Sequence, residues 1–323
     1  MRAVVTGATG FVGRRLLEYL DRPTVLTRNP EKARDSLEKS LGIASSLIAI
    51  HPWNAEKEPA PPAAFEGADV VFHLAGEPVA EGRWTAEKKR RLRASRELGT
   101  RNLVATLAEL AVKPKVLISA SAVGFYGDAG DAILDENAPR GNDFLAEICE
   151  AWERESRTAE QAGIRVVNPR IGIVLGRNGG ALAKMLTPFY LGAGSPLGSG
   201  RQWMPWIHLD DLIGLMLFAA DNEQLHGPVN ATAPNPVTNR DFTKALGRAV
   251  RRPTILPPVP AFVLRLMFGE LADVLLESQR AVPKALEQAG YPFQFPELQP
   301  ALEDILQGDG YQHRPAHREE AAA

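Results

Sequence analysis

The sequence predicts an α/β fold, in which a doubly wound parallel sheet in the first half is joined to a smaller C-terminal α/β domain. Three observations lead to this prediction. The chain opens on a strand, a glycine turn and a helix; its first half then alternates apolar strands with helical segments; beyond residue 176 glycine turns and aromatic residues take over. Strands that alternate with helices form parallel sheets covered on both faces. The length of 323 residues fits about two domains.

The opening unit is a short buried strand over residues 2–6, a turn, and an amphipathic helix over residues 11–20. Glycines recur at every third position of the turn, and they permit backbone angles that other residues adopt only at a cost. A diphosphate can then approach the bare backbone and the free N–H groups at the start of the helix. The alternative is a glycine turn that binds nothing. The flanking strand and helix favour a dinucleotide site, with these contacts: Gly7, Thr9, Gly10, Phe11, Val12 and Gly13.

The rest of the first half supplies the other elements in alternation. Strands are predicted over residues 23–27, 44–50, 68–76, 115–120 and 165–167, and helices over residues 86–110 and 144–161. Ligands of such sheets lie at the carboxyl ends of the strands. One strand ends in Leu74, Ala75 and Gly76, and this decrease in size lets a dinucleotide pass close by, so these residues are predicted cofactor contacts.

The end of the second strand indicates which dinucleotide is bound. Proteins that bind NAD place an Asp or Glu at this point to hold the ribose 2′-hydroxyl. This chain has Thr27, Arg28 and Asn29 instead. A guanidinium can form two parallel hydrogen bonds to a phosphate, so Arg28 favours a 2′-phosphate and hence NADP(H). The alternative is an arginine that simply ends the strand in solvent.

Composition and charge exclude several classes of protein. The net charge of −2, with acidic and basic residues interspersed, argues against a nucleic-acid or membrane partner. The longest apolar run, residues 212–220, is too short to span a bilayer. Cys149 is the only cysteine, which excludes an internal disulfide, and a strand that begins at residue 2 leaves no room for a signal peptide. We expect a cytoplasmic protein without a metal site, whose partner is a small molecule.

Two runs in the first half, TGATGFVG at residues 6–13 and DVVFHLAG at residues 69–76, resemble the extended and atypical short-chain dehydrogenase/reductases of the NAD-dependent epimerase/dehydratase superfamily. Further runs resemble its "epimerase family", or cell-division inhibitor-like, branch, which carries a C-terminal domain of unknown function: SASAVGFYG (119–127), DFLAE (143–147), WE (152–153), GSGRQWM (198–204), WIHLDD (206–211), NATAPNPVT (230–238) and PKAL (283–286). The resemblance implies a Rossmann-like domain, NADP(H) and a smaller substrate domain.

The resemblance also implies a Tyr-x-x-x-Lys pair on a helix, with a Ser or Thr at the end of the preceding strand. In that pair the phenol exchanges a proton with the substrate, and the lysine lowers the pKa of the phenol. Aligned by Glu153, the helix has Leu145 in place of the tyrosine and Cys149 in place of the lysine. A frame shifted by one residue gives Phe144 and Ile148. The standard pair is therefore absent.

The residues left for catalysis near this strand end are Ser119, Ser121 and Tyr126. Ser121 is the better match to the strand-end hydroxyl, and Tyr126 could supply a proton through Ser121 or water. Alternatively, Tyr126 packs its ring against the cofactor and does no chemistry, because a phenol without a nearby cation keeps a pKa near 10. Arg170 follows the strand over residues 165–167 and is predicted to contact the nicotinamide half, with a plain surface arginine as the alternative.

The second domain is predicted to comprise residues 177–206 and 228–309, with residues 207–227 packing back on the dinucleotide domain, residues 1–176. A cation between glycines and two indoles can anchor a ligand in an apolar pocket, so the predicted substrate contacts are Arg201, Gln202, Trp203 and Trp206. The alternative is an exposed loop arginine beside buried tryptophans. A helix over residues 259–268 is expected to pack in the core or as a lid. Residues 310–323 are expected to be disordered.

These features predict an NADP(H)-dependent oxidoreductase or nucleotide-sugar epimerase of atypical type, acting on a hydroxyl-bearing ligand. The rival is a protein that binds NADP(H) without turnover, as a redox sensor or regulatory protein. Loss of the Tyr/Lys pair favours this rival. A flavin-type reductase is a weaker alternative, because nothing in the sequence is suited to an isoalloxazine ring.

Overall fold

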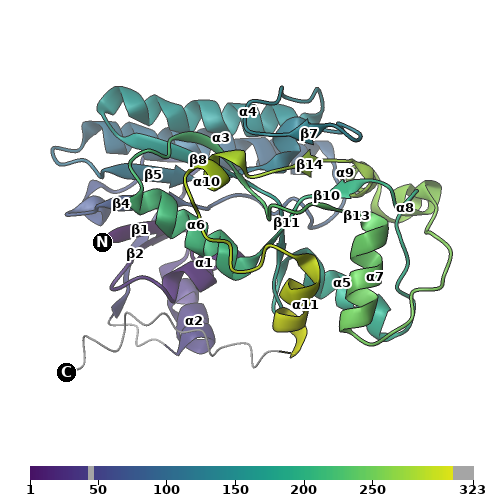
Figure 1. Cartoon of the computed structure of the whole chain (residues 1–323). Helices are drawn as coiled ribbons and strands as arrows, with labels where there is room; N and C mark the ends of the chain where they lie inside the picture. Colours follow the sequence, from purple (N-terminus) through teal and green to yellow (C-terminus); the bar gives the residue numbers. More distant parts are fainter. Residues whose placement is uncertain (43–46, 308–323) are drawn as a thin grey trace.

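The computed structural model describes residues 1–42 and 47–307, and its centre is a parallel sheet with helices on both faces (Figure 1). The sheet order is β3-β2-β1-β4-β5-β8-β12, with β6 beside β8. Its strands are β1 (Ala3–Thr6), β2 (Thr24–Thr27), β3 (Ala49–Pro52), β4 (Val70–His73), β5 (Val116–Ser119), β6 (Ser121–Ala122), β8 (Arg165–Ile171) and β12 (Gly227–Ala231). The order reverses between β1 and β4, where such sheets bind their ligands. The predicted doubly wound, Rossmann-like sheet is confirmed.

Two helical layers cover the sheet, and strand residues alternate between them. In Figure 1 the helices α3 (Ala86–Glu109) and α4 (Phe144–Arg157) lie on one face, and α1 (Phe11–Leu17), α2 (Pro30–Leu41) and α6 (Leu209–Asp221) lie on the other. Successive side chains of a strand point to opposite faces. Val4 accordingly packs in the core with Leu103 of α3, whereas Val5 packs with Leu16 of α1 and Leu212 of α6. The strands are therefore buried on both faces.

The second region has its own core and three small two-stranded ladders. The ladders are β9 (Ile173–Leu175) with β11 (Trp206–His208), β10 (Trp203–Met204) with β13 (Val237–Thr238), and β7 (Ile133–Leu134) with β14 (Arg280–Ala281). The helices are α5 (Gly180–Tyr190), α7 (Asn239–Ala249), α8 (Ala261–Phe268), α9 (Leu271–Leu276), α10 (Lys284–Gln288) and α11 (Leu298–Gln307). Leu182, Trp206, Phe242 and Leu302 form the centre of this core. Short 3-10 turns η2 (Pro62–Phe65), η3 (Val123–Tyr126) and η4 (Thr158–Ala162) complete the described elements.

Two sequence-based boundaries and one expectation about burial need correction. The third strand is Ala49–Pro52 rather than residues 44–50, of which residues 44–46 lie outside the described part. Residues 228–231 belong to β12, which pairs with β8, so they extend the sheet and not the substrate domain. In α8 the side chains of Phe262, Leu266 and Met267 face outward, and Leu264 alone on this helix is buried, so its apolar stripe is not core packing.

Two further expectations concern the C-terminal tail and membrane-spanning helices. The predicted disordered tail, residues 310–323, lies outside the described residues. Within residues 1–42 and 47–307, no helix combines the length and the apolar character needed to cross a membrane.

Candidate functional site

A crevice of about 280 Å³ lies at the carboxyl ends of β1, β2 and β4, on the reversal point of the sheet. It brings together most of the residues that the sequence predicted for the cofactor: Gly7, Thr9, Gly10, Arg28, Leu74, Ala75 and Gly76. These residues come from three separate strand ends. Their convergence is what a dinucleotide site at a switch point requires.

The glycines of the opening turn are needed because backbone meets backbone there. Gly7 has a φ of +72°, and a Cβ on it would lie 2.7 Å from the carbonyl carbon of Leu74. A Cβ on Gly13 would lie 2.4 Å from the carbonyl oxygen of Gly7. The hydroxyl of Thr6 accepts a hydrogen bond from the N–H of Ala75 at 3.2 Å and ties the turn to the end of β4. Only glycine leaves this surface open to a diphosphate.

Three residues of the predicted cofactor set support the turn without lining the crevice. Phe11 packs its ring against Gly176 and Gly179, where an added Cβ would lie 2.6 and 2.5 Å from ring carbons. Val12 packs against the core on the α1 face of the sheet. Gly13 permits the close approach of α1 to the turn. Their direct contact with a cofactor stays a prediction.

Arg28 stands at the end of β2 with its side chain exposed beside the crevice. The following residue, Asn29, caps α2 by accepting a hydrogen bond from the N–H of Lys32 at 3.0 Å. The carboxylate of Glu77 also lines the crevice, but it forms an ion pair with Lys88 at 2.8 Å. The hydrogen bond from Lys88 lowers the pKa of Glu77, as do the charges of Arg91 and Arg28. No ion pair to Arg28 occurs within the described part of the chain, so its guanidinium is available for an anion.

Sequence reasoning missed one wall of the crevice. Trp53, Asn54, Ala55 and Glu56 line it from the chain that follows β3. The indole N–H of Trp53 donates to the carbonyl of Glu58 at 3.0 Å, which fixes this loop. The signal was the position of β3: a strand that ends at residue 52 places these residues at the same sheet edge as the glycine turn.

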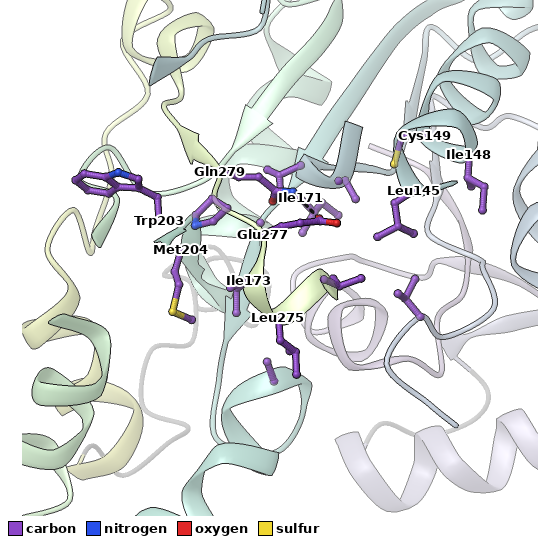
Figure 2. A pocket seen from close by; sticks show the side chains of 18 of the residues that line it. Leu145, Ile148, Cys149, Ile171, Ile173, Trp203, Met204, Leu275, Glu277 and Gln279 are labelled. Atoms are coloured by element: carbon purple, nitrogen blue, oxygen red, sulfur yellow. Dashed lines mark hydrogen bonds between the residues drawn. The ribbon is translucent and has the colours of Figure 1, made fainter. Parts of the chain in front are cut away.

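A second pocket, also of about 280 Å³, lies where the sheet meets the second region (Figure 2). Its wall is mostly apolar and includes Val79, Leu92, Leu145, Ile148, Ile171, Ile173, Met185, Leu197, Trp203, Met204, Val274 and Leu275. Among the described residues that line it, three carry ionisable groups: Arg96, Cys149 and Glu277. An apolar cavity with a few polar groups is the usual form of a small-molecule site.

The two helix positions at which the superfamily carries its Tyr/Lys pair both face this pocket. Leu145 and Cys149, one turn apart on α4, line it together. Burial raises the pKa of the Cys149 thiol to about 12, with the charge of Arg96 acting in the opposite direction. The thiol is therefore neutral at physiological pH and supplies no positive charge. The two aligned positions thus line one pocket, although neither residue can act as an acid, a base or a cation there.

Glu277 extends into the pocket from the chain that follows α9 (Figure 2). The amide of Gln279 donates a hydrogen bond to its Oε2 at 3.3 Å. Burial raises the pKa of Glu277 to about 7, and the nearby carboxylates of Asp143, Asp128 and Asp273 act in the same direction. This carboxyl group is consequently divided between its two protonation states near neutral pH. The sequence analysis did not identify it, because a glutamate after a short apolar helix forms no motif.

Arg96 of α3 reaches the same pocket from the opposite domain. Its Nη1 donates to the carbonyls of Glu77 and Leu92 at 3.1 and 3.2 Å, and its Cζ lies 5.0 Å from the centre of the Trp152 ring. A Cβ on Gly76, which lines the cofactor crevice, would lie 3.4 Å from this Cζ. The guanidinium thus sits between the crevice and the pocket. Burial lowers the pKa of Arg96, and no carboxylate within the described ranges forms an ion pair with it.

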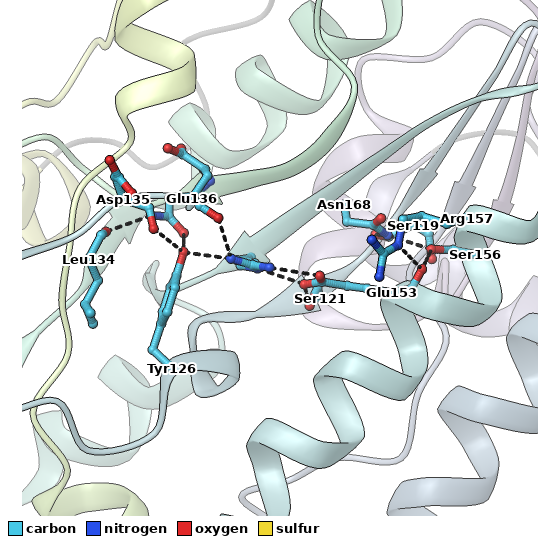
Figure 3. Close-up of polar contacts among 12 residues, drawn as sticks. Ser119, Ser121, Tyr126, Leu134, Asp135, Glu136, Glu153, Ser156, Arg157 and Asn168 are labelled. Atoms are coloured by element: carbon cyan, nitrogen blue, oxygen red, sulfur yellow. Dashed lines mark hydrogen bonds and ion pairs between the residues drawn. The ribbon is translucent and has the colours of Figure 1, made fainter. Parts of the chain in front are cut away.

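Two of the predicted catalytic residues, Ser121 and Tyr126, belong to a buried network with Arg170 (Figure 3), whereas the buried hydroxyl of Ser119 has no hydrogen-bond partner among the described residues. Arg170 donates to both carboxylate oxygens of Glu153, from Nε at 2.8 Å and from Nη2 at 3.0 Å. The hydroxyl of Ser121 donates to the same carboxylate at 2.7 Å. The hydroxyl of Tyr126 lies 2.7 Å from Oδ1 of Asn230 and accepts a hydrogen bond from Arg170 at 3.0 Å. These groups satisfy one another inside the protein.

The surroundings of four predicted site residues differ from those expected, and their catalytic or cofactor roles stay predictions. Ser119, Ser121, Tyr126 and Arg170 do not line the pocket that holds Leu145 and Cys149. Burial raises the pKa of Tyr126 to about 12, against the lowering effect of Arg170, so its phenol keeps its proton. Arg170 is not a surface arginine, because it is buried and forms an ion pair with Glu153 on α4, and its contact with a cofactor stays a prediction. The partner could not be recognised from the sequence, since it lies on a different element.

Of the four predicted substrate contacts, Trp203 alone lines the pocket. Its ring also lies beneath the guanidinium of Arg280, 4.3 Å from ring centre to Cζ. Arg201 is exposed on the surface. Gln202 is buried, and its side-chain amide donates a hydrogen bond to the carbonyl of Leu197 at 3.0 Å. Trp206 is fully buried, and its indole N–H donates a hydrogen bond to the carbonyl of Asn235. These two side chains hold the loop in place and are not aimed at a ligand.

Comparison with known proteins agrees with this geometry. The model of the NAD dependent epimerase/dehydratase family matches residues 3–231, and that of a domain of unknown function (DUF1731) matches residues 259–305. The chain belongs to the NAD dependent epimerase/dehydratase family. The match confirms the resemblance inferred from the sequence and, at the level of the family's description, a nicotinamide dinucleotide as the class of cofactor.

Similar proteins span the length of the chain. The "Epimerase family protein SDR39U1 homolog, chloroplastic" of Arabidopsis thaliana is 40% identical over 313 residues, which cover 95% of this chain and 87% of that protein. A crystal structure of human epimerase family protein SDR39U1 (isoform 2) with NADPH superposes with a TM-score of 0.83 at 32% identity, covering 95% of this chain and 99% of the other. UDP-glucuronic acid 4-epimerase from Bacillus cereus shares the fold, with a TM-score of 0.74 at 17% identity over 95% and 98% of the chains.

Proposed function

We propose that the chain binds NADP(H) and acts as an oxidoreductase on a small, largely apolar molecule that carries a carbonyl or hydroxyl group. The crevice supplies the diphosphate cradle, and a free guanidinium at the end of β2 suits the 2′-phosphate. The similar human protein SDR39U1 is described with NADPH, which supports the phosphorylated form for this chain. When bound, the cofactor would supply or accept a hydride at the inner end of the crevice.

The observation that carries this proposal is the apolar pocket that adjoins the crevice. Gly76 lines the crevice, Arg96 contacts Gly76, and the same arginine lines the pocket, so a dinucleotide in the crevice would extend toward it. The apolar wall favours a substrate with little polar surface, because sugar hydroxyls buried there would lose their hydrogen bonds to water. A volume of about 280 Å³ also suits a small molecule better than a nucleotide sugar.

Cofactor binding is tested by thermal unfolding with NADPH, NADP⁺, NADH and no ligand. A nucleotide that binds only the folded protein raises Tm by mass action. We expect a larger shift for NADPH and NADP⁺ than for NADH at equal concentration. Equal shifts for NADH and NADPH would contradict the assignment of the phosphorylated cofactor.

Turnover is tested by following NADPH absorbance with a panel of small aliphatic and aromatic aldehydes and ketones. We expect oxidation of NADPH that saturates with at least one apolar carbonyl compound. Saturable binding of NADPH without oxidation by any compound of the panel would contradict the oxidoreductase assignment.

A second candidate is a protein that binds NADP(H) without turnover, as a sensor of its redox state. The absence of the Tyr/Lys pair at Leu145 and Cys149 favours this candidate. It predicts different Tm shifts for NADPH and NADP⁺ and no consumption of either. The two assays above therefore separate the candidates.

A further inference from the structure

The apolar pocket contains ionisable groups where the family pattern does not place them. Leu145 and Cys149 occupy the positions of the missing pair and are chemically inert. Glu277 and Arg96 line the same cavity from other elements, one from the chain after α9 and one from α3. A cavity with one acid and one cation in an apolar wall has the composition of a proton-transfer site.

The backbone around Glu277 is fixed, so its carboxyl group has a defined place. Its N–H donates to the carbonyl of Asp273 at 2.9 Å, which ends α9. The next residue, Ser278, donates its N–H to Oδ1 of Asp128 at 3.1 Å and its hydroxyl to the carbonyl of Gly130 at 2.5 Å. The side chain then extends into the pocket, on whose wall Leu145 stands (Figure 2).

Glu277 also borders solvent on its other side. It lines a second cleft of about 620 Å³, whose wall includes Asp128, Arg140 and Asp143. One carboxyl group therefore belongs to both the closed apolar pocket and a cleft bounded by charged side chains. A group in this position can exchange its proton with solvent on one side and with a bound molecule on the other.

Arg96 stands where a positive charge can act on both the cofactor and the pocket. Its Cζ lies 3.4 Å from the Cβ position of Gly76 in the crevice wall, and its charge interacts with Cys149, the residue at the lysine position. Among the described residues, main-chain carbonyls and the Trp152 ring hold it. A guanidinium without a carboxylate keeps its full charge for a ligand.

We infer that Glu277 is the proton-transfer residue of this protein and that Arg96 is the fixed positive charge in the wall of the same pocket, so that the two replace the tyrosine and lysine of the superfamily. The inference rests on the proposed oxidoreductase function. In this inference Arg96 positions the ribose on the nicotinamide side of NADP(H). Glu277 contacts the substrate oxygen. The replacement draws the acid from the second domain and the cation from the first.

In the direction of reduction, the proposed step transfers one hydride and one proton to the substrate carbonyl group. A hydride, with its two electrons, adds to the carbonyl carbon of the substrate, and the electron pair of the C=O π bond moves to oxygen. The carboxyl group of Glu277 gives that oxygen its proton, so an alcohol forms. NADPH becomes NADP⁺, and the Glu277 carboxylate regains a proton from water through the charged cleft.

The pH dependence of this step depends on the charges around Glu277. Asp143, Asp128 and Asp273 disfavour its ionised form, while Arg140 across the cleft and Arg96 across the pocket are the cations on the facing walls. Reduction needs the protonated acid, so kcat/KM should fall as pH rises above neutrality. The reverse oxidation needs the carboxylate and should rise over the same range.

The first experiment compares Glu277→Gln with wild type, using Glu287→Gln, an exposed glutamate of α10, as the matched control. In protein labelled with ¹³C at glutamate carboxyl carbons, we expect one resonance that titrates near neutral pH and is missing in Glu277→Gln. NADPH affinity by calorimetry should be unchanged in Glu277→Gln, whereas kcat for carbonyl reduction should fall about 100-fold or more. Glu287→Gln should keep all three properties of the wild type.

The outcomes separate the inference from the proposed function. Wild type that turns over carbonyl compounds at a rate unchanged in Glu277→Gln overturns the inference alone. A Glu277 resonance that titrates in the ordinary glutamate range also overturns it. Wild type that binds NADPH but reduces no carbonyl compound overturns the proposed function, and the role of Glu277 with it.

The second experiment compares Arg96→Met and Arg96→Lys, with Arg93→Met as the control, because Arg93 lies one turn away on the same helix and forms a surface ion pair with Glu147. We expect Arg96→Met to weaken NADPH binding about 10-fold or more, and Arg96→Lys to restore part of the affinity. Arg93→Met should bind NADPH as wild type does. Wild-type affinity in Arg96→Met, or equal weakening in Arg93→Met, overturns the role assigned to Arg96.

Discussion

The cofactor crevice and the apolar pocket are neighbouring cavities of the same volume, yet they are built in opposite ways. The crevice is built around the main chain of the glycine turn, at the ends of neighbouring strands. The pocket is made of side chains from segments spread between Val79 and Gln279. The first is specified by a local pattern that glycine spacing reveals, and the second exists only after the two regions have packed. The difference teaches that the cofactor site is encoded locally and the chemistry of the pocket is not.

The largest expected effect tests whether main-chain proximity defines the crevice. Gly7→Ala should lower the free energy of unfolding by about 3 kcal/mol or more and abolish NADPH binding, because the added Cβ meets the Leu74 carbonyl. Gly82 has the same φ of +72° with no atom within 4 Å of its Cβ position. Gly82→Ala should therefore cost only about 1 kcal/mol, from backbone strain. Denaturant unfolding measures the stability of both variants. Equal losses of unfolding free energy would show that the contact between the added Cβ and the Leu74 carbonyl does not matter.

The next effect concerns a buried histidine beneath the crevice. His73 is fully buried between the hydroxyls of Thr6 and Thr100, at 2.8 and 3.0 Å, and burial lowers its pKa to about 4. The unfolded chain takes up the proton first as pH falls, so the contribution of His73 to stability is complete above pH 6.5 and is lost toward pH 4. The expected loss is about 3 kcal/mol.

Chemical denaturation at pH 7, 5.5 and 4 measures this dependence. His73→Gln should flatten the pH profile, even if its stability is lower at every pH. His226→Gln, at an exposed histidine, should leave the profile as it is in wild type. An unchanged slope in His73→Gln would assign the acid sensitivity to another group.

A smaller effect tests how the crevice selects its nucleotide. Arg28→Ala should weaken binding of NADPH about 10- to 100-fold and leave NADH binding unchanged, because the proposed partner of the guanidinium is the 2′-phosphate, which NADH lacks. Lys39→Ala removes an exposed charge from the far end of the following helix α2 and serves as the control. Calorimetric titration with both nucleotides measures the preference. Parallel losses for NADPH and NADH in Arg28→Ala would contradict the assignment.

The smallest expected effect concerns the network outside the pocket. Tyr126→Phe removes the acceptor of one Arg170 hydrogen bond and should cost about 1 to 2 kcal/mol of stability. Cofactor affinity and kcat should stay at wild-type values, because Tyr126 does not line the pocket that holds Leu145 and Cys149. A large loss of kcat at unchanged stability would return Tyr126 to the catalytic set and weaken the contrast between network and pocket.

The sequence was sufficient for most of the sheet and for the glycine-turn side of the cofactor crevice, since both follow from patterns within single segments, but not for the wall that follows β3. The glycine turn, the alternation of strands and helices, and the position of Arg28 are of this kind. Residues 228–231 were placed in the wrong region, because a short strand after α6 carries no sign of the sheet that it joins. The outward stripe of α8 shows the same limit: helical spacing reveals an apolar face but not what covers it.

The sequence predicted part of the pocket wall but not the charged side chains that line it. The alignment paired Leu145 with Cys149, both of which line this pocket, and showed that the usual pair was missing. The buried ion pair of Arg170 was not foreseen, because its partner, Glu153, lies on another element. Glu277 was missed because its pKa is raised first by burial between two regions and then by carboxylates such as Asp143 and Asp128, which are more than a hundred residues away in the chain. Long-range electrostatics of this kind has no local signature.

The hydrogen bonds of Ser278 have a consequence for how a molecule reaches the pocket. Together with the β7–β14 ladder they join the segment that carries Glu277 to the loop after η3, which belongs to the first half of the chain. A hinge that swung the halves apart would have to break all of these bonds at once. A small molecule should therefore enter and leave this pocket when side chains at its rim change rotamer, while the two halves of the protein stay in contact.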